Sequence, residues 1–531
     1  MPVQPSYPGV YIEEIPSDVH TITGAATSIT AFIGRALRGD LNSAITITSF
    51  SDFQTLFGGV WADSMMSYAV KDFYLNGGSK AVIVRIAKNA TKSNIKVLVD
   101  GGAPGAFFTL EAASEGSWGD NLKISINYKT KDPTDSSLFN LLVAEAVDGG
   151  STEKFLNVSV NSNDPRYLPR VLNQSSMLVR VKGTMSTFRP KSTLVAVLTS
   201  PPSSPPDMVD NPISVSVKGS DGVDVGASEY QGEEKSKTGI YALENEDFNI
   251  LCIPPPSRDA DTDPDVYSDA LALCVASRAM LLVDAPTTWG DVQAPVLAVN
   301  NAINGLGDLD LTGPATRNAA LFFPRVLQSD PMRDGQIETF APCGMIAGIM
   351  ARTDTARGVW KSPAGIDATL NGIRGLQINL SDDQNGQLNP LGINCLRSFP
   401  VVGQVVWGTR TLRGADELAD EYKYIAVRRT ALFIEESLYR GTKWVVFEPN
   451  DEPLWAQIRL NIGAFMQNLF RQGAFQGKTP KEAYLVKCDS ETTSQNDINS
   501  GIVNILVGFA PLKPAEFVIL KIQQLAGQID S

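Results

Sequence analysis

Apolar strands alternate with amphipathic helices in the first part of the chain. Residues 26–36 form an apolar run that predicts a strand, and residues 49–58 predict a short capped helix. Residues 64–76 have helical spacing, and a Gly-Gly pair ends this helix before the apolar strand of residues 81–86. This order of strand, helix and strand is typical of a parallel sheet covered by helices on both faces.

The pattern changes between residues 92 and 240. Short strands of alternating apolar and polar residues, such as KISINYK, FLNVSV and ISVSV, are separated by polar turns and by a proline- and serine-rich loop at residues 200–212. We predict a mainly β domain inserted into the α/β core. A solvent-facing decoration and a receptor-binding domain both remain open for it.

The α/β pattern resumes after the insertion. It predicts strands at residues 248–254, 279–286 and 319–326 and helices at residues 265–278 and 293–303. The two segments that flank the insertion therefore form one α/β core that is interrupted in sequence.

A further domain is predicted beyond Cys343. It contains a strand at residues 404–412, a strand followed by a helix within residues 424–440, and a strand at residues 444–449. The clearest helix follows Asn450 or Asp451 and ends at Gly473, with Pro453 in its first turn. Its apolar stripe comprises Leu454, Ile458, Ile462, Phe465 and Leu469. Strand candidates at residues 483–488, 501–509 and 516–524 close the chain.

Both ends of the chain carry an isolated strand candidate. Prolines interrupt residues 1–20 and leave only residues 9–15 as a strand, and flexible joints are predicted at residues 17–24 and 510–514. The residues predicted for donation to a neighbouring sheet are Val10, Tyr11, Ile12, Ile15, Phe517, Val518, Ile519, Leu520 and Ile522. A single chain has no partner for such strands, so we predict that each arm pairs with the sheet of another subunit.

Composition narrows the possible partners and compartments. The net charge of -13 argues against nucleic acid and anionic lipid as partners. The five cysteines are scattered and form no CxxC pair, which predicts reduced, mostly buried thiols. We expect no secretion signal and no direct membrane insertion, because no apolar run is long enough.

Motifs spread over most of the chain carry a resemblance to a known family. They are YPGVYIEEIPS, ITAFIGRALRG, FQTLFGG, FYLNGGSKAVIVRI, APCGMIAGIMARTDTARGVWKSPAG, VVWGTRTL, YIAVRRTALFIEESLYRGTKWVVFEPNDEPLWAQIR and LVGFAPLKPAEFVILKIQQ. In this order and spacing, the chain resembles the contractile tail sheath proteins of myophages, R-type pyocins and phage-tail-like injection systems. Only residues 92–240 lack the family pattern. The type VI secretion sheath is less similar, because it is divided between two proteins.

The resemblance implies a multidomain α/β fold. The expected parts are an N-terminal arm (1–20), a subtilisin-like α/β middle domain (21–91 plus 241–342), a β-rich insertion (92–240), an α+β C-terminal polymerisation domain that faces the tube (343–509), and a C-terminal arm (510–531).

The resemblance also implies a structural function. Such a subunit assembles as hexameric rings around an inner tube, and contracts without ATP from a metastable extended state to drive the tube through a target envelope. Its expected partners are itself, the inner tube protein, and baseplate and tail terminator proteins. It would be made in the bacterial cytoplasm and would end in a virion tail or a phage-tail-like particle. A phage tail is favoured, and an extracellular injection system is the alternative.

Basic residues on or after the long helix are candidates for contact with the tube, because in the resembling family a C-terminal helix faces the tube through charged side chains. They are Arg459, Arg471 and Lys478, for which a solvated helix face is the alternative. The Arg428-Arg429 pair predicts an exposed or ion-paired helix start.

No enzymatic chemistry is predicted. A subtilisin-like hydrolase needs an imidazole beside its serine, whereas the only histidine, His20, lies in the arm, and there is no GxSxG motif. The alternating Asp259, Asp261, Asp263 and Asp265 lack the order of a calcium loop and favour a helix entry instead. NGGSK and KSPAG do not match a phosphate-binding loop, so no cofactor is expected.

Overall fold

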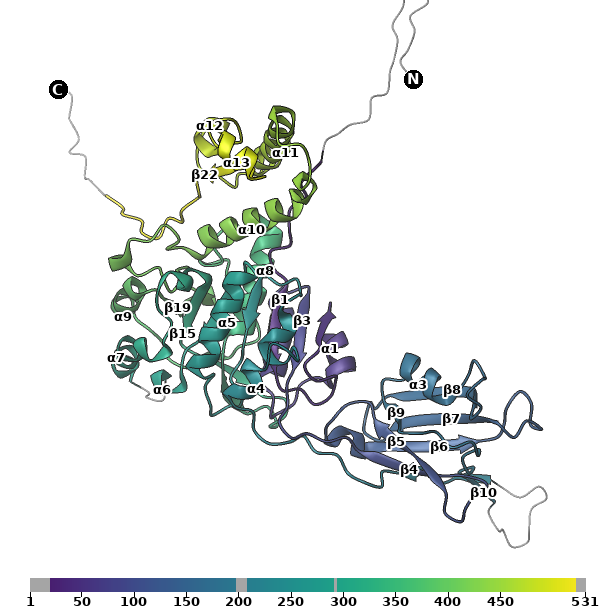
Figure 1. The fold of residues 1–531 in the computed structure, drawn as a ribbon. Coiled ribbons are helices and arrows are strands. Elements are labelled where there is room, and N and C mark those ends of the chain that lie inside the picture. The colour runs from purple at the N-terminus through teal and green to yellow at the C-terminus, as the bar shows by residue number, and fades with distance from the viewer. Residues whose placement is uncertain (1–19, 197–207, 291–293, 522–531) are drawn as a thin grey trace, which may run out of the picture. The chain divides into compact units, whose positions relative to one another are not determined.

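A computed structural model describes residues 20–196, 208–290 and 294–521 (Figure 1). The chain divides into two compact units. The larger unit comprises Ser28–Arg352 and Pro363–Asp420, and the smaller unit comprises the described residues of Met1–Thr27, Thr353–Ser362 and Glu421–Ser531.

An eight-stranded sheet forms the centre of the larger unit (Figure 1). In spatial order its strands are β2 (Ala44–Ile47), β3 (Ala81–Arg85), β1 (Thr30–Gly34), β13 (Ile250–Cys252), β14 (Met280–Asp284), β15 (Ala319–Phe323), β19 (Ile393–Phe399) and β20 (Gly403–Val406). All neighbouring pairs from β3 to β19 are parallel, and the two edge strands are antiparallel. The predicted α/β core is confirmed.

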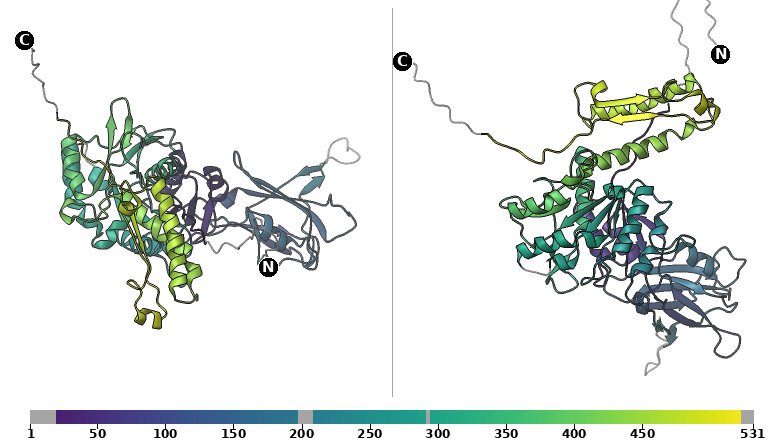
Figure 2. Two further views of the ribbon diagram at one scale, coloured as in Figure 1. Left: turned by 90° about the horizontal axis from the view of Figure 1, so that it is seen from above. Right: turned by 60° about the vertical axis from the view of Figure 1, so that its left-hand side comes forward.

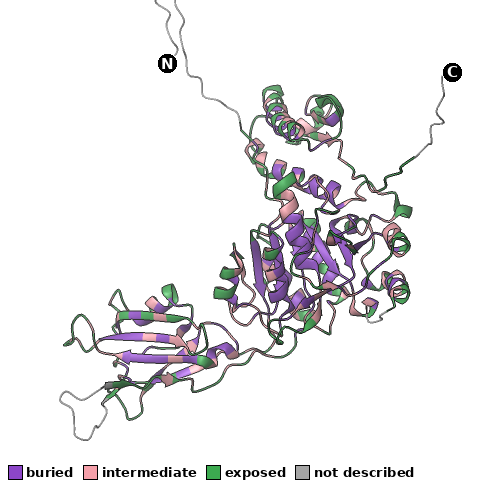
Figure 3. Cartoon of the chain, turned by 180° about the vertical axis from the view of Figure 1, so that it is seen from behind, coloured by how far each residue is buried: buried purple, intermediate pink, exposed green. Residues whose placement is uncertain are grey.

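Helices cover both faces of this sheet, whose central strands are buried (Figure 3). Ala31 and Ile33 of β1 belong to the apolar cluster that includes α5 (Pro264–Ala276) and α7 (Pro295–Gly305). Phe32 points to the opposite face, where its ring lies 5.6 Å from that of Phe73 in α2 (Met65–Leu75). The helix α8 (Cys343–Arg357) packs on α2 through Gly344, where an added Cβ would lie only 2.1 Å from the Ala69 carbonyl oxygen.

Two antiparallel sheets build the inserted domain. One has the order β12 (Ile213–Ser214), β6 (Leu122–Asn127), β7 (Leu138–Glu145), β8 (Thr152–Ser159), and the other β4 (Asn94–Leu98), β5 (Phe107–Ala112), β9 (Val179–Lys182). A ribbon of β10 (Leu194–Ala196) and β11 (Met208–Asp210) is added to them. The two sheets share one apolar core.

The units differ from the predicted domain limits at two places. Val225 and Tyr230, which lie within the predicted insertion, pack into the core of the central sheet. At the other limit, β19 and β20 extend the central sheet beyond residue 343, and the larger unit continues to Asp420. The strand predicted at residues 404–412 is shorter in the structure, where β20 begins at Gly403 and ends at Val406.

Two long helices and a β-ribbon form the smaller unit. They are α10 (Ile425–Gly441), α11 (Glu452–Arg471), β21 (Tyr484–Lys487) and β22 (Leu506–Phe509). The predicted cap of α11 is confirmed, since the Asp451 side chain accepts a hydrogen bond from the backbone N–H of Leu454 at 3.2 Å.

The shorter helices of the chain are α1 (Phe50–Phe57), α3 (Leu168–Ser175), α4 (Ala227–Gln231), α6 (Thr287–Gly290), α9 (Asp382–Leu388), α12 (Pro480–Ala483) and α13 (Gln495–Asn499), and the remaining strands are β16 (Val326–Ser329), β17 (Ile337–Phe340) and β18 (Gly375–Leu376).

Two predicted strands of this unit are wrong. Residues 424–427 do not form a strand, because α10 already begins at Ile425 and its first three residues, Ile425, Ala426 and Val427, are all buried. Residues 444–449 contain a short 3-10 turn, Lys443–Val445, followed by an irregular loop. In both places packing overrides the strand preference of β-branched residues.

Candidate assembly surfaces

The β21–β22 ribbon buries one face and exposes the other. Tyr484 lies opposite Phe509 and Val486 opposite Val507, and these side chains pack against the apolar cluster that contains α11. Leu485 and Leu506 point to the other face, and each is 52% exposed. Figure 2 shows the ribbon beside the long helices of its own unit. An antiparallel ribbon with one covered face thus leaves apolar side chains in solvent.

Both long edges of the ribbon are also open. Among the described residues, β21 and β22 pair only with each other. At the base of the ribbon, the backbone N–H of Ala510 donates to the Ala483 carbonyl at 2.8 Å, and that of Gln476 donates to the Ala510 carbonyl at 2.9 Å. Beyond these bonds the outer edges carry N–H and C=O groups that another strand can pair with.

The C-terminal arm carries a run of exposed apolar side chains. Phe517, Val518, Ile519 and Leu520 are 73%, 77%, 81% and 82% exposed, and no strand is formed in the described part of this segment. Just before the run, Glu516 accepts a hydrogen bond from the Tyr424 hydroxyl at 3.0 Å. The other residues predicted for donation, Val10, Tyr11, Ile12, Ile15 and Ile522, lie outside the described residues.

Arg459 is held by its own unit. Its guanidinium donates to the Glu452 carboxylate at 2.6 Å and to the backbone carbonyl of Cys488, just after β21. The hydrogen bond that Arg459 donates to Glu452 raises the pKa of Arg459. Arg459 therefore ties α11 to the ribbon, and its side chain is less available to a partner than the sequence suggests.

Arg471 and Lys478 are exposed, as a contact surface requires. Arg471 lies in the last turn of α11, where a cation also favours the helix dipole. Lys478 follows the helix, and its backbone N–H donates to the Glu482 carboxylate at 2.8 Å. The exposed positions between Arg459 and Arg471 are neutral, namely Leu460, Ala464 and Asn468. The C-terminal half of α11 therefore carries a single charged residue, Arg471.

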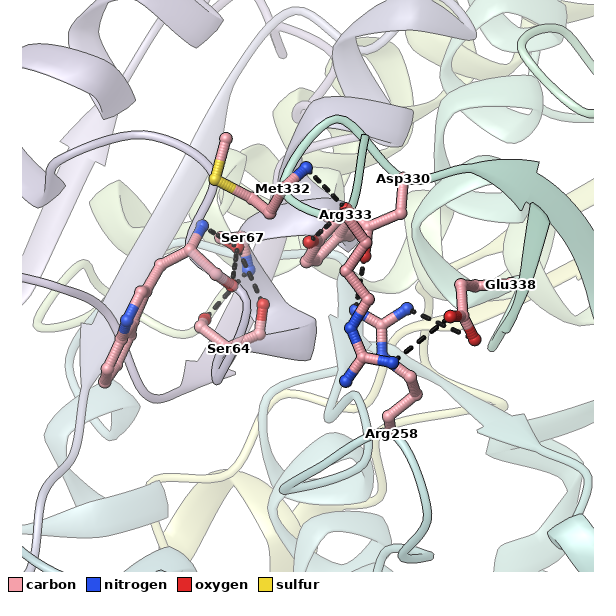
Figure 4. Close-up of polar contacts among 9 residues, drawn as sticks. Ser64, Ser67, Arg258, Asp330, Met332, Arg333 and Glu338 are labelled. Atoms are coloured by element: carbon pink, nitrogen blue, oxygen red, sulfur yellow. Dashed lines mark hydrogen bonds and ion pairs between the residues drawn. The ribbon is translucent and has the colours of Figure 1, made fainter. Parts of the chain in front are cut away.

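The histidine and two of the serines that a hydrolase could use each make contacts within their own unit. In the smaller unit, His20 stacks on Trp444 with ring centroids 4.3 Å apart. In the larger unit, the Ser64 hydroxyl donates to the Arg35 carbonyl and the Ser67 hydroxyl donates to the Ser64 carbonyl at 2.7 Å (Figure 4). These serines support the start of α2.

A buried ion pair lies beside these serines. Asp330 accepts hydrogen bonds from the Tyr68 hydroxyl at 2.7 Å and from Arg258 at 2.6 Å, and Arg258 also faces Glu338 (Figure 4). Burial acts to raise the pKa of Asp330, but hydrogen bonds from Tyr68, the Met332 backbone and Arg258 outweigh it and lower the pKa. The cluster joins α2 to the β16–β17 hairpin and is structural.

The acidic run before α5 is a helix entry. Asp263 caps α5 by accepting a hydrogen bond from the backbone N–H of Asp265, and Asp261 pairs with Arg325 at 2.5 Å. In the described part of the chain, no three His, Cys, Asp or Glu side chains are grouped to hold a metal ion. The five cysteines are all buried and unpaired, as predicted. None of the helices found in the described residues has the length and hydrophobicity of a membrane span.

Comparisons with known proteins assign these units to a family. A model of the phage tail sheath protein central domain matches residues 227–412, and a model of the phage tail sheath C-terminal domain matches residues 418–524. Together these two matches cover more than half of the chain.

Individual relatives agree with the family models. The tail sheath protein of Vibrio phage KVP40 is 29% identical over 180 residues, which are 33% of this chain and 25% of that protein. The tail sheath protein of Enterobacteria phage T4 is 28% identical over 157 residues, 29% of this chain and 22% of that protein. The matched region thus spans only about a quarter of the length of these relatives.

The fold matches over almost the whole chain. The sheath of an extracellular contractile injection system, the PVC sheath complex in its contracted state, superposes with a TM-score of 0.55 at 20% identity, covering 98% of each chain.

Proposed function

This chain belongs to the contractile tail sheath family, and we propose that it is the structural subunit of a contractile sheath. In this proposal it polymerises as hexameric rings around an inner tube and contracts from a metastable extended state to drive the tube through a target envelope. The observation that carries the proposal lies in the smaller unit, which has a β-ribbon with two open edges and an arm with four exposed apolar side chains in succession.

Strand donation would pair the open edges of the ribbon and would also cover the exposed apolar side chains of the arm. An arm that pairs with the ribbon of a neighbour gains ladder hydrogen bonds of about 1 kcal/mol each and buries its apolar side chains at about 1.5 kcal/mol each. Each subunit both donates and accepts, so the contact is heterologous and propagates into a polymer rather than closing a dimer. The residues proposed for donation are Val10, Tyr11, Ile12, Ile15, Phe517, Val518, Ile519, Leu520 and Ile522.

The larger unit is proposed to be a rigid, non-enzymatic body. A subtilisin-like fold of the middle domain is consistent with its parallel sheet covered by helices on both faces. Catalysis is not part of the proposal, because the only histidine stacks on Trp444 and the serines of α2 donate to backbone carbonyls. Contraction needs only a second packing of such bodies with more buried surface, and small gains per subunit add up along a polymer.

The proposed partners are further copies of the chain, the inner tube protein, and baseplate and tail terminator proteins. Assembly is proposed to take place in the bacterial cytoplasm before the particle is released. A phage tail is favoured by the phage relatives, and an extracellular injection system is supported by the fold match to the PVC sheath. Electron microscopy of purified particles distinguishes the two by the presence or absence of a capsid.

Truncation tests the assembly mechanism. We expect deletion of residues 1–19, or of every residue after 510, to leave the circular dichroism and the cooperative melt close to those of the full chain, while polymers disappear from electron micrographs. Polymers of normal length from either truncated chain would contradict strand donation. Unfolding of both truncated monomers would do so as well, because it would show that the arms belong to their own subunit's core.

A further inference from the structure

Phe447 is fully exposed in a strained backbone conformation. It lies in the loop between α10 and α11, is 101% exposed and has a φ of 73°. The left-handed region is unfavourable for an aromatic residue, and such strain persists only where the surroundings impose it. Its neighbour Val446 is 62% exposed. This combination of strain and exposed apolar surface contributes nothing to the stability of the isolated subunit.

The loop that carries Phe447 is firmly anchored at both ends. Before it, Trp444 and Val445 pack against the apolar core of the smaller unit. After it, the Asn450 side chain donates to the Ile502 carbonyl at 2.9 Å and accepts a hydrogen bond from the indole of Trp455 at 2.9 Å. A ring held out on a rigid loop loses little conformational entropy on binding, which is the property of an interface anchor.

The same hydrogen bond links the loop to the segment that leads into β22. Ile502, tied to the loop by Asn450, is 47% exposed and precedes the first residue of β22 by four positions. We call Val446, Phe447 and Ile502 the Phe447 patch. The exposed acidic residues Glu448 and Asp451 lie on the same loop.

We propose that the Phe447 patch binds the C-terminal arm of a second copy of this chain. The arm offers a matching surface, since its four exposed apolar residues lie between Lys513 and Lys521 and would meet the apolar patch and its acidic neighbours. Four residues of extended chain span about 13 Å, which is the length of the four-residue strand β22. The inference rests on the proposed function and adds the residue that anchors the arm.

Photo-crosslinking of the assembled full chain tests this contact. With p-benzoylphenylalanine at position 447, irradiated polymers should give dimers that are linked to the peptide containing residues 513–521. Mixing isotopically labelled and unlabelled chains shows that the link joins two copies. Polymers that crosslink to another peptide, or not at all, overturn the inference but leave the proposed function intact. A wild-type chain that never polymerises would instead remove the proposed function.

Substitution gives an independent readout. Phe447→Gly removes the ring and relieves the left-handed strain, so the monomer should melt at the same temperature or higher, while the concentration needed for polymerisation rises by about tenfold or more. Val401→Gly is the matched control, because Val401 in the larger unit also has a φ of 73° and is 107% exposed. Its polymerisation threshold should not change. An unchanged threshold for Phe447→Gly overturns the inference.

Discussion

Arg429 and Asp354 form a bidentate ion pair that is closed off from solvent. The two guanidinium–carboxylate distances are 2.9 and 2.6 Å, and the side chains are 3% and 4% exposed. The same guanidinium donates to the Thr27 carbonyl at 2.9 Å. The pair therefore joins three segments of the smaller unit, namely the one after the N-terminal arm, the end of α8, and α10.

Removing one partner of this pair should strongly destabilise the smaller unit. Asp354→Ala leaves a buried guanidinium without its counterion, which costs about 3–5 kcal/mol of unfolding free energy. Urea denaturation followed by tryptophan fluorescence measures the loss. Glu435→Ala is the control, because Glu435 is half-exposed in its pair with Arg428 and should matter by less than about 1 kcal/mol. Equal effects of the two substitutions would contradict the structural role of the buried pair.

Asp72 should make stability depend on pH. It is buried on α2, where burial raises the pKa of its carboxyl to about 7 against a hydrogen bond of 2.7 Å from Gln328. The folded state therefore holds a proton that the unfolded state releases between about pH 4 and pH 7. Unfolding free energy falls as the pH rises through this window, and the full penalty is present above it.

Asp72→Asn removes this titration and keeps an acceptor for Gln328. At pH 8 we expect the variant to be more stable than the wild type by about 2–4 kcal/mol, and at pH 4 to be equally stable. Denaturation at a series of pH values measures the difference. A constant difference between pH 4 and pH 8 would show that Asp72 is not neutral in the folded protein.

The sequence predicts the parts of the fold that depend on local pattern. The central strands are uniformly apolar. The helix α11 can be predicted from its cap Asp451, from Pro453 in its first turn, and from its unbroken apolar stripe. Prediction from the sequence fails at residues 424–427 and 444–449, where β-branched residues suggest strands. The first range begins α10 instead, and the second forms a rigid loop. Only the neighbouring core decides between these outcomes, and that core is assembled from distant segments.

The candidate surfaces, too, can be predicted only where they depend on local sequence pattern. The arms can be recognised from sequence because they lie at the chain ends and are apolar without a partner. The exposure of Phe447 cannot be recognised from the sequence, because WVVFEP has the composition of a buried strand. The pairing of Arg429 with Asp354 also cannot be predicted from the sequence, since no local pattern links residues 75 positions apart.

The close contact between α8 and α2 predicts opposite effects for two glycine substitutions. Gly344→Ala places a Cβ 2.1 Å from the Ala69 carbonyl oxygen, so the helices must separate and stability should fall by at least about 1–3 kcal/mol. Gly386→Ala in α9 is the control, since no heavy atom lies within 4 Å of its Cβ, and helix propensity should add up to about 1 kcal/mol. Thermal melts of both variants measure the effects. A harmless Gly344→Ala would contradict this packing.

Arg471 and Lys478 provide the test of contact with the tube. Both are exposed, so the double variant Arg471→Glu and Lys478→Glu should keep the urea midpoint of the wild type but assemble less on isolated tubes, most clearly at low salt, where screening is weakest. Arg459→Glu is unsuitable because it would break the bonds to Glu452 and Cys488 and weaken the monomer itself.

The control for this test must match the change in net charge. Lys154→Glu and Lys235→Glu reverse two exposed lysines of the larger unit and should leave tube-dependent assembly unchanged. Sedimentation of sheath with tubes, measured at several salt concentrations, compares the two double variants. If both lose assembly equally, the effect is one of net charge alone. If the Arg471 and Lys478 variant sediments like the wild type at every salt concentration, the end of α11 does not face the tube.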